Sequence, residues 1–407
     1  MPHPAAPPEA FRPRLHHGVL EYPVHHMRGG TSTGLVLWEK WAPSPLALRE
    51  ELLKHLMGAP LAGHDRDNRQ ITGLGRGSPT SNKVFFADVA KAAGLASITS
   101  RLAQLANDHA GIDWSVNCGN MSAALQLWAL DTGLVAPPAG PGTFDAQIHN
   151  ANTGILTVSR MALDAAGALS TSEIPGVRGA YPAVDLFLQS PVGAKTGRML
   201  PTGAATDEIE GFTVSCVDVA VPMVICDARE FGKTGQETIP ELESDERLRH
   251  ALRKIWIAAG LRMGLRKQDG GLMSEADLAS SETIPKVCLV SAPTQGGNLA
   301  VRYFTPQRGH ASMAVSGGCC LAAAALIQGT VACRLAQDLP PLEDALTDVQ
   351  VALENPAGIL NTTISASMAA GVVRVEGAAY RRNAQILVRG YVPLYRASAE
   401  LARALLA

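Results

Sequence analysis

Short apolar runs separated by glycine-rich turns dominate the first part of the chain. Residues 19–37 hold two such runs on either side of the sequence MRGGTSTG, which predicts a strand, a tight loop and a second strand. A helix should follow, because Ser44 and Pro45 suit its N-cap and first position and Gly58 suits its end. Its apolar face consists of Leu48, Leu52, Leu53 and Leu56.

The pattern then returns to strands and to a helix of small residues. KVFFADV at 83–89 and residues 113–118 predict two short strands. The sequence NCGN at 117–120 leads directly into a small-residue helix, Met121–Leu130. Further short strands are expected between about 145 and 190. A glycine-containing loop therefore opens a helix here.

The second half of the chain repeats this order of elements. SGGCC opens an alanine-rich helix at Cys319–Gln328, much as NCGN opens the helix of the first half. Aligning the two helices places Asn117–Asn120 over Ser316–Cys319, so we infer an internal duplication. The other elements predicted here are a strand pair around 212–227, a helix Asp245–Met263, a strand Lys286–Ser291, a strand Ala384–Tyr391 and a helix Ala397–Leu406.

The length favours two domains, because 407 residues exceed the usual size of one hydrophobic core. Residues 1–18 are rich in Pro and His and show no period, so we expect a flexible tail. We place an N-terminal domain at 19–200, completed by about 384–407, and a C-terminal domain at 201–383. The loop KTGRMLPTG at 195–203 has the features of a crossover between them.

Composition and charge exclude several classes of function. The formal net charge of −2 gives no long-range field for nucleic acid or anionic lipid. No apolar run reaches the roughly 18 residues of a membrane span, and the first residues lack the apolar core of a secretory signal. We therefore expect a cytoplasmic protein with neither a membrane nor a nucleic-acid partner. Seven cysteines without CxxC spacing predict buried thiols rather than disulfides or zinc, and the paired histidines lack further ligands, so we expect no metal.

Cys118 is the first candidate for proton chemistry. A cysteine at a helix N-terminus has its thiolate stabilised by the helix dipole and by nearby N–H groups. An inert buried thiol is the alternative, but Gly119 and the flanking asparagines favour backbone exposure and polar contacts. The duplicated position holds Gly317, so a pair of facing thiols is not predicted. Cys319 and Cys320 fall on the first helical turn, where we expect packing residues.

Lys83 is the second candidate. It follows the loop GLGRGSPTSN, in which Gly73, Gly75 and Gly77 allow the backbone to approach a ligand. A lysine at the rim of such a loop can be desolvated enough to lose its proton near neutral pH. A phosphate-binding GxxxxGK[ST] motif is absent, because Val84 follows Lys83. On this loop alone, a solvated lysine at a strand end is the competing interpretation.

Polar residues near these loops are candidates for holding an anion. Arg28 and Arg76 suit bidentate pairing with carboxylates, and the hydroxyl of Ser32 lies where it could reach the same ligand. If the N-termini of the two alanine-rich helices face each other, their free N–H groups favour a carboxylate there. His310 precedes the second helix and suits a ligand contact or an auxiliary proton group. The full set of expected substrate-binding residues is Arg28, Thr31, Ser32, Arg76, Ser81, Asn117, Gly119, Asn120, His310, Ser316, Gly317 and Gly318.

Five motifs, taken in order, resemble the signatures of the PrpF family between about residues 20 and 395. The family includes 2-methylaconitate cis–trans isomerase, 4-oxalomesaconate tautomerase and 3-methylitaconate Δ-isomerase. The resemblance implies an α+β, diaminopimelate-epimerase-like fold with two similar domains, each a mixed sheet around a central helix, and the active site in the cleft between them. It also implies cofactor-independent allylic isomerisation of an unsaturated di- or tricarboxylate. The motifs are MRGGTSTG at 27–34, GLGRGSPTSNK at 73–83, NCGN at 117–120, KTGRMLPTG at 195–203 and VDVAVP at 217–222.

The resemblance also assigns roles to individual residues. The lysine that ends the family's glycine loop falls on Lys83 and the cysteine of its NCGN motif falls on Cys118, the same pair that the residues themselves indicate. The family's loop serine falls on Ser32, and its histidine ahead of the second helix falls on His310. The two latter side chains are therefore expected near the substrate.

Three departures from the family pattern bear on the choice of substrate. Thr33 stands where the loop usually carries Lys or Arg, Val221 stands where Asn is common, and ENPAG at 354–358 replaces a motif with His-Pro-Ser-Gly. Three questions stay open: the substrate, which of the two proton groups is the base, and whether the chain forms a homo-oligomer. An epimerase or racemase of amino or hydroxy acids, and a non-catalytic carboxylate-binding protein, are the alternative functions.

Overall fold

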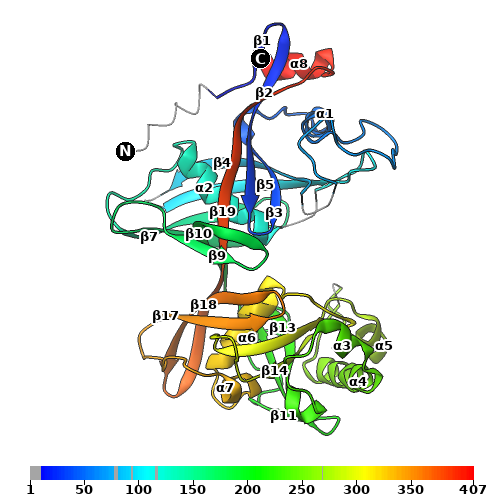
Figure 1. Ribbon diagram of the computed structural model, residues 1–407, viewed down its shortest axis with the longest axis vertical. Helices are drawn as coiled ribbons and strands as arrows, with labels where there is room; N and C mark the ends of the chain where they lie inside the picture. The colour runs from blue at the N-terminus through cyan, green and yellow to red at the C-terminus, as the bar shows by residue number, and fades with distance from the viewer. Residues whose placement is uncertain (1–10, 78–80, 93–94, 115–117, 268) are drawn as a thin grey trace. The chain divides into compact units, whose positions relative to one another are not determined.

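The computed structural model divides into two compact units, each visible in Figure 1. Unit 1 contains Met1–Leu186 and Arg382–Ala407, and unit 2 contains Phe187–Arg381. The structure describes residues 11–77, 81–92, 95–114, 118–267 and 269–407.

Two long strands carry the chain from one unit to the other. β10 (Val177–Gln189) leaves unit 1, and β19 (Val372–Pro393) returns to it. We expected the first crossing in the loop at 195–203, whereas β10 crosses earlier. The division between the units falls between Leu186 and Phe187, both of which lie within this strand.

Unit 1 contains a mixed sheet. β2 and β3 form the predicted antiparallel hairpin, β3 runs parallel to β4, β4 antiparallel to β5, β5 parallel to β7, and β7 antiparallel to β8. Parallel neighbours need a crossover, and the helices α1 and α2 lie in the two crossovers. These elements are β2 (Val19–Gly29), β3 (Ser32–Trp38), α1 (Leu46–Met57), β4 (Lys83–Ala92), β5 (Leu95–Leu105), α2 (Gly119–Asp131), β7 (Gly142–Asn150) and β8 (Leu156–Leu163).

Unit 2 repeats the same order of pairings. β12 and β13 are antiparallel, β13 runs parallel to β14, β14 antiparallel to β15, β15 parallel to β17, and β17 antiparallel to β18. Helices α3, α4 and α5 lie in the first crossover and α6 lies in the second. The repetition confirms the predicted α+β fold class with two similar domains. These elements are β12 (Phe212–Val219), β13 (Val221–Asp227), α3 (Ile239–Ser244), α4 (Glu246–Arg262), α5 (Glu275–Ser280), β14 (Lys286–Ser291), β15 (Leu299–Thr305), α6 (Val315–Leu326), β17 (Thr347–Asn355) and β18 (Gly358–Ala369).

Helices α2 and α6 are the central helices of their units. Every residue from Met121 to Ala129 in α2 is buried, and so is every residue from Gly317 to Leu326 in α6. A helix that is buried all round needs partners on several sides. α2 packs against β2, β3, β4, β7 and β8, and α6 packs against β12, β13, β17 and β18 (Figure 1). Each unit is therefore a sheet around a helix, as predicted.

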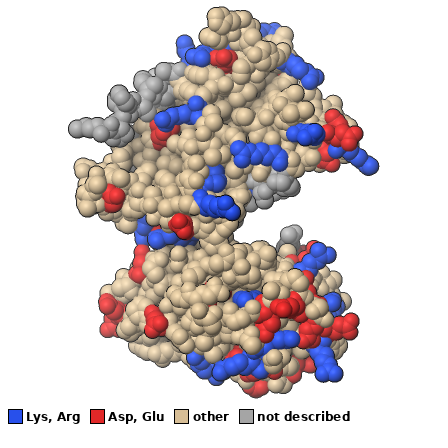
Figure 2. Space-filling view, in the orientation of Figure 1, with Lys and Arg blue, Asp and Glu red and all other residues tan. Residues whose placement is uncertain are grey.

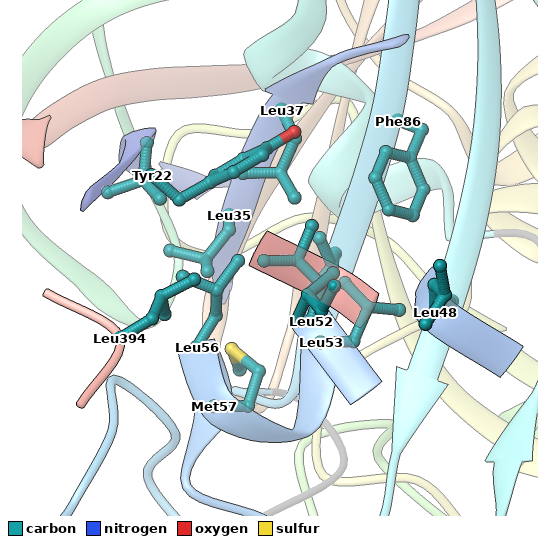
Figure 3. Close-up of a cluster of buried hydrophobic side chains, with 14 of the residues drawn as sticks. Tyr22, Leu35, Leu37, Leu48, Leu52, Leu53, Leu56, Met57, Phe86 and Leu394 are labelled. Carbon is teal, nitrogen blue, oxygen red and sulfur yellow. The ribbon is translucent and has the colours of Figure 1, made fainter. Parts of the chain in front are cut away.

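A second core lies on the face of the unit 1 sheet that points away from α2 (Figure 3). Leu35 and Leu37 point to this side because they alternate along β3 with Gly34 and Val36. α1 buries its predicted leucine face here together with α8 (Ala399–Leu406). Full burial of one leucine side chain contributes about 1.5–3 kcal/mol. Leu74, in the glycine-rich loop that follows α1, packs against this core.

Two helix starts differ from the prediction. α1 begins at Leu46 with Pro45 as its N-cap, one residue later than expected, and no side chain caps it. α6 begins at Val315 rather than Cys319, so Cys319 and Cys320 lie beyond its first turn. The glycines of SGGCC are inside this helix because they leave room for neighbouring side chains. A Cβ on Gly317 would lie 2.5 Å from the ring of Tyr303.

Two further predicted segments of unit 1 differ in their described parts. Of the strand expected at 113–118, residues 115–117 lie outside the described residues, β6 (Ile112–Asp113) includes its first residue, and Trp114 stacks on Phe86 with ring centroids 6.3 Å apart. The flexible tail was wrong over Arg14–His16, which form β1 and pair with β2. A turn of two residues with positive φ closes this hairpin.

The remaining predicted elements are confirmed, including α4, β14, β19 and α8. Lys and Arg are interspersed with Asp and Glu over the face seen in Figure 2, in keeping with the net charge of −2. No helix among the described residues is long and apolar enough to cross a membrane. The shorter elements are η2 (Glu39–Trp41), β9 (Thr171–Ile174), β11 (Asp207–Ile209), η3 (Ala228–Phe231), β16 (Arg308–Gly309) and α7 (Val331–Leu335).

Candidate active site

Cys118 is the N-cap residue of α2, so it lies at the start of a helix as predicted. Its backbone is extended, with φ −134° and ψ 97°, and its sulfur accepts a hydrogen bond from the backbone N–H of Met121 at 3.4 Å. Free N–H groups and the helix dipole favour negative charge at this position. The half-buried thiol therefore lies where negative charge is favoured, and its role in proton transfer stays a prediction.

The glycine-rich turn between β2 and β3 lies against this helix start. A Cβ on Gly29 would lie 2.5 Å from the backbone oxygen of Asn120, so only glycine lets β2 come this close to α2. Ser32 is 2% exposed and pairs directly with Gly29 across the hairpin. Its Oγ lies 3.9 Å from the sulfur of Cys118. The turn thus brings a hydroxyl and a thiol together.

Lys83 is the first residue of β4 and its side chain is buried, with 7% exposed. Its amine donates a hydrogen bond to the side-chain oxygen of Gln104 on β5. Lys83 aligns with Gly34 in the parallel pair of β3 and β4. A side chain at Gly34 would collide with the carbonyl group of Lys83. The competing interpretation of Lys83 as a solvated lysine at a strand end is therefore wrong, because the side chain is buried.

The two proton-handling candidates lie on one face of one sheet. Ser32 points toward Cys118, and Gly34 is two residues further along β3, so both lie on the α2 side. Lys83 stands beside Gly34 on the neighbouring strand and shares that side. The backbone positions of Ser32 and Lys83 are therefore about 8 Å apart, from two residues along a strand and one strand across. Because the sulfur of Cys118 lies 3.9 Å from the hydroxyl of Ser32, the thiol is on the same side of these strands as Lys83.

Two buried amides fix the glycine loop ahead of Lys83. Gln70 is 1% exposed, and its side-chain oxygen accepts hydrogen bonds from the N–H of Gly77 at 2.7 Å and the amide of Asn82 at 2.9 Å. Asn82 in turn accepts from the backbone N–H of Arg76 at 3.1 Å. The guanidinium of Arg76 is exposed. Burial, helped by the charge of Arg76, lowers the pKa of His26 to about 4, so this histidine is neutral near pH 7.

Arg28 lies on the opposite face of the β2–β3 hairpin from Ser32. It alternates with Gly29, which faces α2, and it is 8% exposed. Its guanidinium donates to the carbonyl of Gly30 at 2.8 Å and to the side-chain oxygen of Asn383 at 2.7 Å, and burial lowers its pKa. Through these contacts Arg28 stabilises the turn between β2 and β3. Its expected contact with substrate stays a prediction.

A third arginine, Arg382 on β19, contacts the start of α2 and was not predicted from the sequence. Arg382 is 8% exposed and donates through Nε to the side-chain oxygen of Asn120 at 2.8 Å. The amide of Asn120 donates to the hydroxyl of Thr31 at 3.2 Å. Consecutive residues of a strand point to opposite faces, so Arg382 faces α2 while Asn383 faces Arg28. Its position in the last long strand gave no motif that could have identified it.

The other expected substrate-binding residues divide between the units. Gly119 is the first residue of α2, Ser81 lies two positions before Lys83, and Asn117 falls outside the described residues. In unit 2, His310 accepts a hydrogen bond from the N–H of Ser312 at 2.9 Å, and burial lowers its pKa. Roles in substrate binding for these residues, and for Ser316, Gly317 and Gly318 on the first turn of α6, stay predictions.

Five of the seven cysteines are buried, which agrees with the prediction of packing thiols; the others are Cys118 and Cys333. Burial raises the pKa of Cys216 to about 12, and it also raises the pKa of Cys226, Cys288 and Cys320. Within the described residues, no group of three or more His, Cys, Asp or Glu side chains is arranged to hold a metal ion.

The chain is similar in sequence to a family of known proteins. Residues 19–395 match the family described as PrpF protein. A 4-oxalomesaconate tautomerase of Pseudomonas putida is 34% identical over 384 residues, which cover 93% of this chain and 98% of the relative. A (4E)-oxalomesaconate Delta-isomerase of Novosphingobium sp. is 30% identical over 382 residues, which cover 93% and 99%.

The fold agrees with this similarity. A crystal structure of a methylitaconate-delta-isomerase superposes with a TM-score of 0.75 at 26% identity, covering 93% of this chain and 98% of that chain. At this coverage the structural match extends over both units, and the family match over residues 19–395 includes the turn at Ser32 and the starts of α2 and α6. This chain is an isomerase, and it belongs to the PrpF family.

Proposed function

We propose that this isomerase moves a proton along an unsaturated di- or tricarboxylate without a cofactor, and so shifts or inverts a carbon–carbon double bond. Relatives named for 4-oxalomesaconate, 3-methylitaconate and 2-methylaconitate support this substrate class. We take 4-oxalomesaconate as the first candidate, because the tautomerase named for it is 34% identical over 93% of the chain.

One observation carries the proposal. Lys83 and Cys118 come from different elements but lie on the same side of the β3–β4 pair, with the hydroxyl of Ser32 beside the thiol at 3.9 Å. An allylic shift removes a proton from one carbon and delivers a proton to another. An amine and a thiol on the same side of the sheet can divide these two steps between them.

The mechanism follows from charge and position. A proton on carbon beside a carboxylate or keto group is weakly acidic, and its removal builds enolate-like charge on the acceptor oxygens. The free N–H groups at the start of α2, with Arg382 hydrogen-bonded to Asn120, favour that charge. One of Lys83 and Cys118 removes the proton, and the other delivers a proton to the far end of the three-carbon unit.

The test is isotope incorporation by the purified protein. 4-Oxalomesaconate, 2-methylaconitate, 3-methylitaconate and trans-aconitate are incubated with the enzyme in D₂O and followed by proton NMR and alkene absorbance. The proposal expects deuterium at the carbon that gains a proton together with a moved or inverted double bond, for 4-oxalomesaconate first. Dialysis against EDTA should leave the rate unchanged. Exchange confined to one stereocentre would instead indicate an epimerase, and binding without exchange would contradict the proposal.

A further inference from the structure

We propose that Gln104 is a positioning residue for the isomerisation, whose uncharged side-chain amide holds the amine of Lys83 at the reacting face while leaving it free to exchange its proton. This inference rests on the proposed role of Lys83. Nothing in the sequence motifs singled out Gln104, because it lies near the end of a strand between the apolar residues Ala103 and Leu105.

The register of the sheet aims Gln104 at Lys83. The two residues are direct partners in the antiparallel pair of β4 and β5. Direct partners have Cβ atoms about 4.5–5.5 Å apart on the same face, so a glutamine and a lysine can meet without leaving the sheet. The amine of Lys83 donates to the side-chain oxygen of Gln104. Because Lys83 is only 7% exposed, this amide replaces much of the water that would surround a surface amine.

The absence of charge on Gln104 is what distinguishes this contact from an ion pair. Elsewhere in the chain, Lys233 lies 2.6 Å from the carboxylate of Asp245, and that hydrogen bond raises the pKa of Lys233. Lys286, by contrast, is partly buried, and burial lowers its pKa. A carboxylate partner therefore stabilises the protonated amine, while an amide partner fixes its direction without adding a negative charge.

Few titratable groups face Lys83 from the elements around it. On β3 its neighbour is Gly34, and Cys118 lies on the same side of the sheet at the start of α2. Asp113 on β6 pairs with Gln104 and so shares this face, but it lies one strand further from Lys83 and is exposed. Within the described residues no carboxylate forms an ion pair with Lys83. The uncharged partner is therefore a feature of this site.

The backbone near Lys83 is anchored separately from its amine. The carbonyl of Asn82 accepts from the N–H of Leu105 at 2.9 Å, and the side chain of Asn82 donates to Gln70 at 2.9 Å. Replacing the half-buried Gln104 side chain leaves both contacts in place. A change in activity can then be traced to the amine rather than to the strand.

The experiment compares two substitutions of Gln104 with a matched control. Gln104→Leu removes the acceptor, and Gln104→Glu replaces it with a carboxylate of similar shape. The control is Gln147→Glu on β7, which also changes a half-buried glutamine to a carboxylate. Gln147 pairs with Ser97 on β5. Ser97 and Gln104 are an odd number of residues apart on that strand, so Gln147 faces the opposite side of the sheet from Gln104. For each protein, kcat and KM are measured as a function of pH, and melting temperature is recorded.

The two variants have distinct expected results. Gln104→Leu should lower kcat by about 100-fold, because a misplaced reacting group costs about that factor. Gln104→Glu should move the limb of the pH–rate profile that depends on Lys83 upward by about 1–3 pH units, because an adjacent carboxylate favours the charged amine. The direction is the same whether Lys83 acts as base or acid. Gln147→Glu should keep the wild-type profile.

The outcomes separate this inference from the proposed function. Suppose that the wild type is active and needs Lys83, but that both Gln104 variants keep the wild-type kcat and pH profile. This result would overturn the inference about Gln104 and leave the proposed function standing. A pH limb that moves equally in Gln147→Glu would also overturn it, because the effect would then be one of added charge. A wild type that isomerises none of the four carboxylates would instead overturn the proposed function.

Discussion

The starts of the two central helices, α2 in unit 1 and α6 in unit 2, differ although they occupy equivalent places in the same sheet order. α2 begins after Cys118, whose sulfur caps the helix and approaches Ser32 at 3.9 Å. α6 begins after Ala314, which has no side-chain cap.

The first turns also differ in what packs against them. On α2, Asn120 binds polar groups of Thr31 and Arg382. On α6, a Cβ on Gly318 would lie 2.7 Å from a methyl group of Leu360, so that turn is closely packed by an apolar side chain. The comparison teaches that both units share a half-buried helix start, while a side-chain sulfur caps the start of α2 and no side chain caps the start of α6.

The largest expected effect is the loss of turnover when the groups specific to α2 and β4 are removed. Lys83→Ala and Cys118→Ser should each lower kcat by about 10²- to 10⁴-fold, the usual contribution of a placed acid or base. Cys333→Ser, on the short helix α7 of unit 2, is the matched thiol control and should keep the wild-type kcat. Steady-state rates measured by alkene absorbance check the three variants. Near-normal turnover in both Lys83→Ala and Cys118→Ser would remove the functional difference between the helix starts.

Thiol reactivity should separate the same two regions without any substitution. At pH 8, iodoacetamide should label Cys118 at least ~10-fold faster than Cys216 or Cys320, because burial raises the pKa of those two thiols and shields them. A bound polycarboxylate should protect Cys118 and leave the labelling of Cys333 unchanged. Peptide mass spectrometry over time gives both rates. Equal labelling of Cys118 with and without ligand would contradict a shared site.

A smaller effect is expected from a methyl group placed between β2 and α2. Gly29→Ala should lower the free energy of unfolding by about 1–3 kcal/mol, because the new Cβ meets the α2 backbone 2.5 Å away. It should also lower kcat, since it displaces the helix start that carries Cys118. Gly140→Ala is the control, because that glycine has an open surrounding and should stay near wild-type stability. Urea unfolding and kcat on the same samples test whether the two losses occur together.

The smallest predicted effect concerns the far end of α2. His25 and Arg389 bind the carboxylate of Asp131; burial alone would raise its pKa, but these hydrogen bonds outweigh burial and lower it. Because the folded pKa is depressed, this stabilisation is present at neutral pH and is lost as the pH falls through the carboxyl range. Asp131→Asn should cost about 1 kcal/mol at pH 7 and flatten the acid side of the stability curve. Thermal unfolding between pH 3 and 7 measures it, and an unchanged curve would show that the contact is dispensable.

Much of the fold could be predicted because the patterns that set it are local. The strand–turn–strand at 19–37, the leucine face of α1 and the strand Lys286–Ser291 all follow from periodicity and turn residues. The start of α6 was misplaced because glycine is unfavourable inside a helix, so the helix was expected to begin after the two glycines. Here Gly317 and Gly318 lie inside it, where contacts with Tyr303 and Leu360, remote in sequence, require small residues.

The candidate site was only partly accessible to sequence reasoning, for the same physical reason. Lys83, Cys118 and Ser32 carry recognisable local contexts, a glycine loop, a helix start and a tight turn. Gln104 and Arg382 do not, because their roles depend on which strands become neighbours. The face on which Arg28 lies likewise follows from the hairpin register and the approach of α2, which the motif alone does not encode.

The most direct measurement of the central claim follows deuterium at both ends of the substrate's three-carbon unit in Lys83→Ala and Cys118→Ser. If these side chains serve one bound carboxylate, neither variant should complete the double-bond shift at more than a small fraction of the wild-type rate, and one of them should still exchange the proton at a single carbon. That surviving exchange would identify the base. Full isomerisation with label at both carbons in either variant would contradict the account.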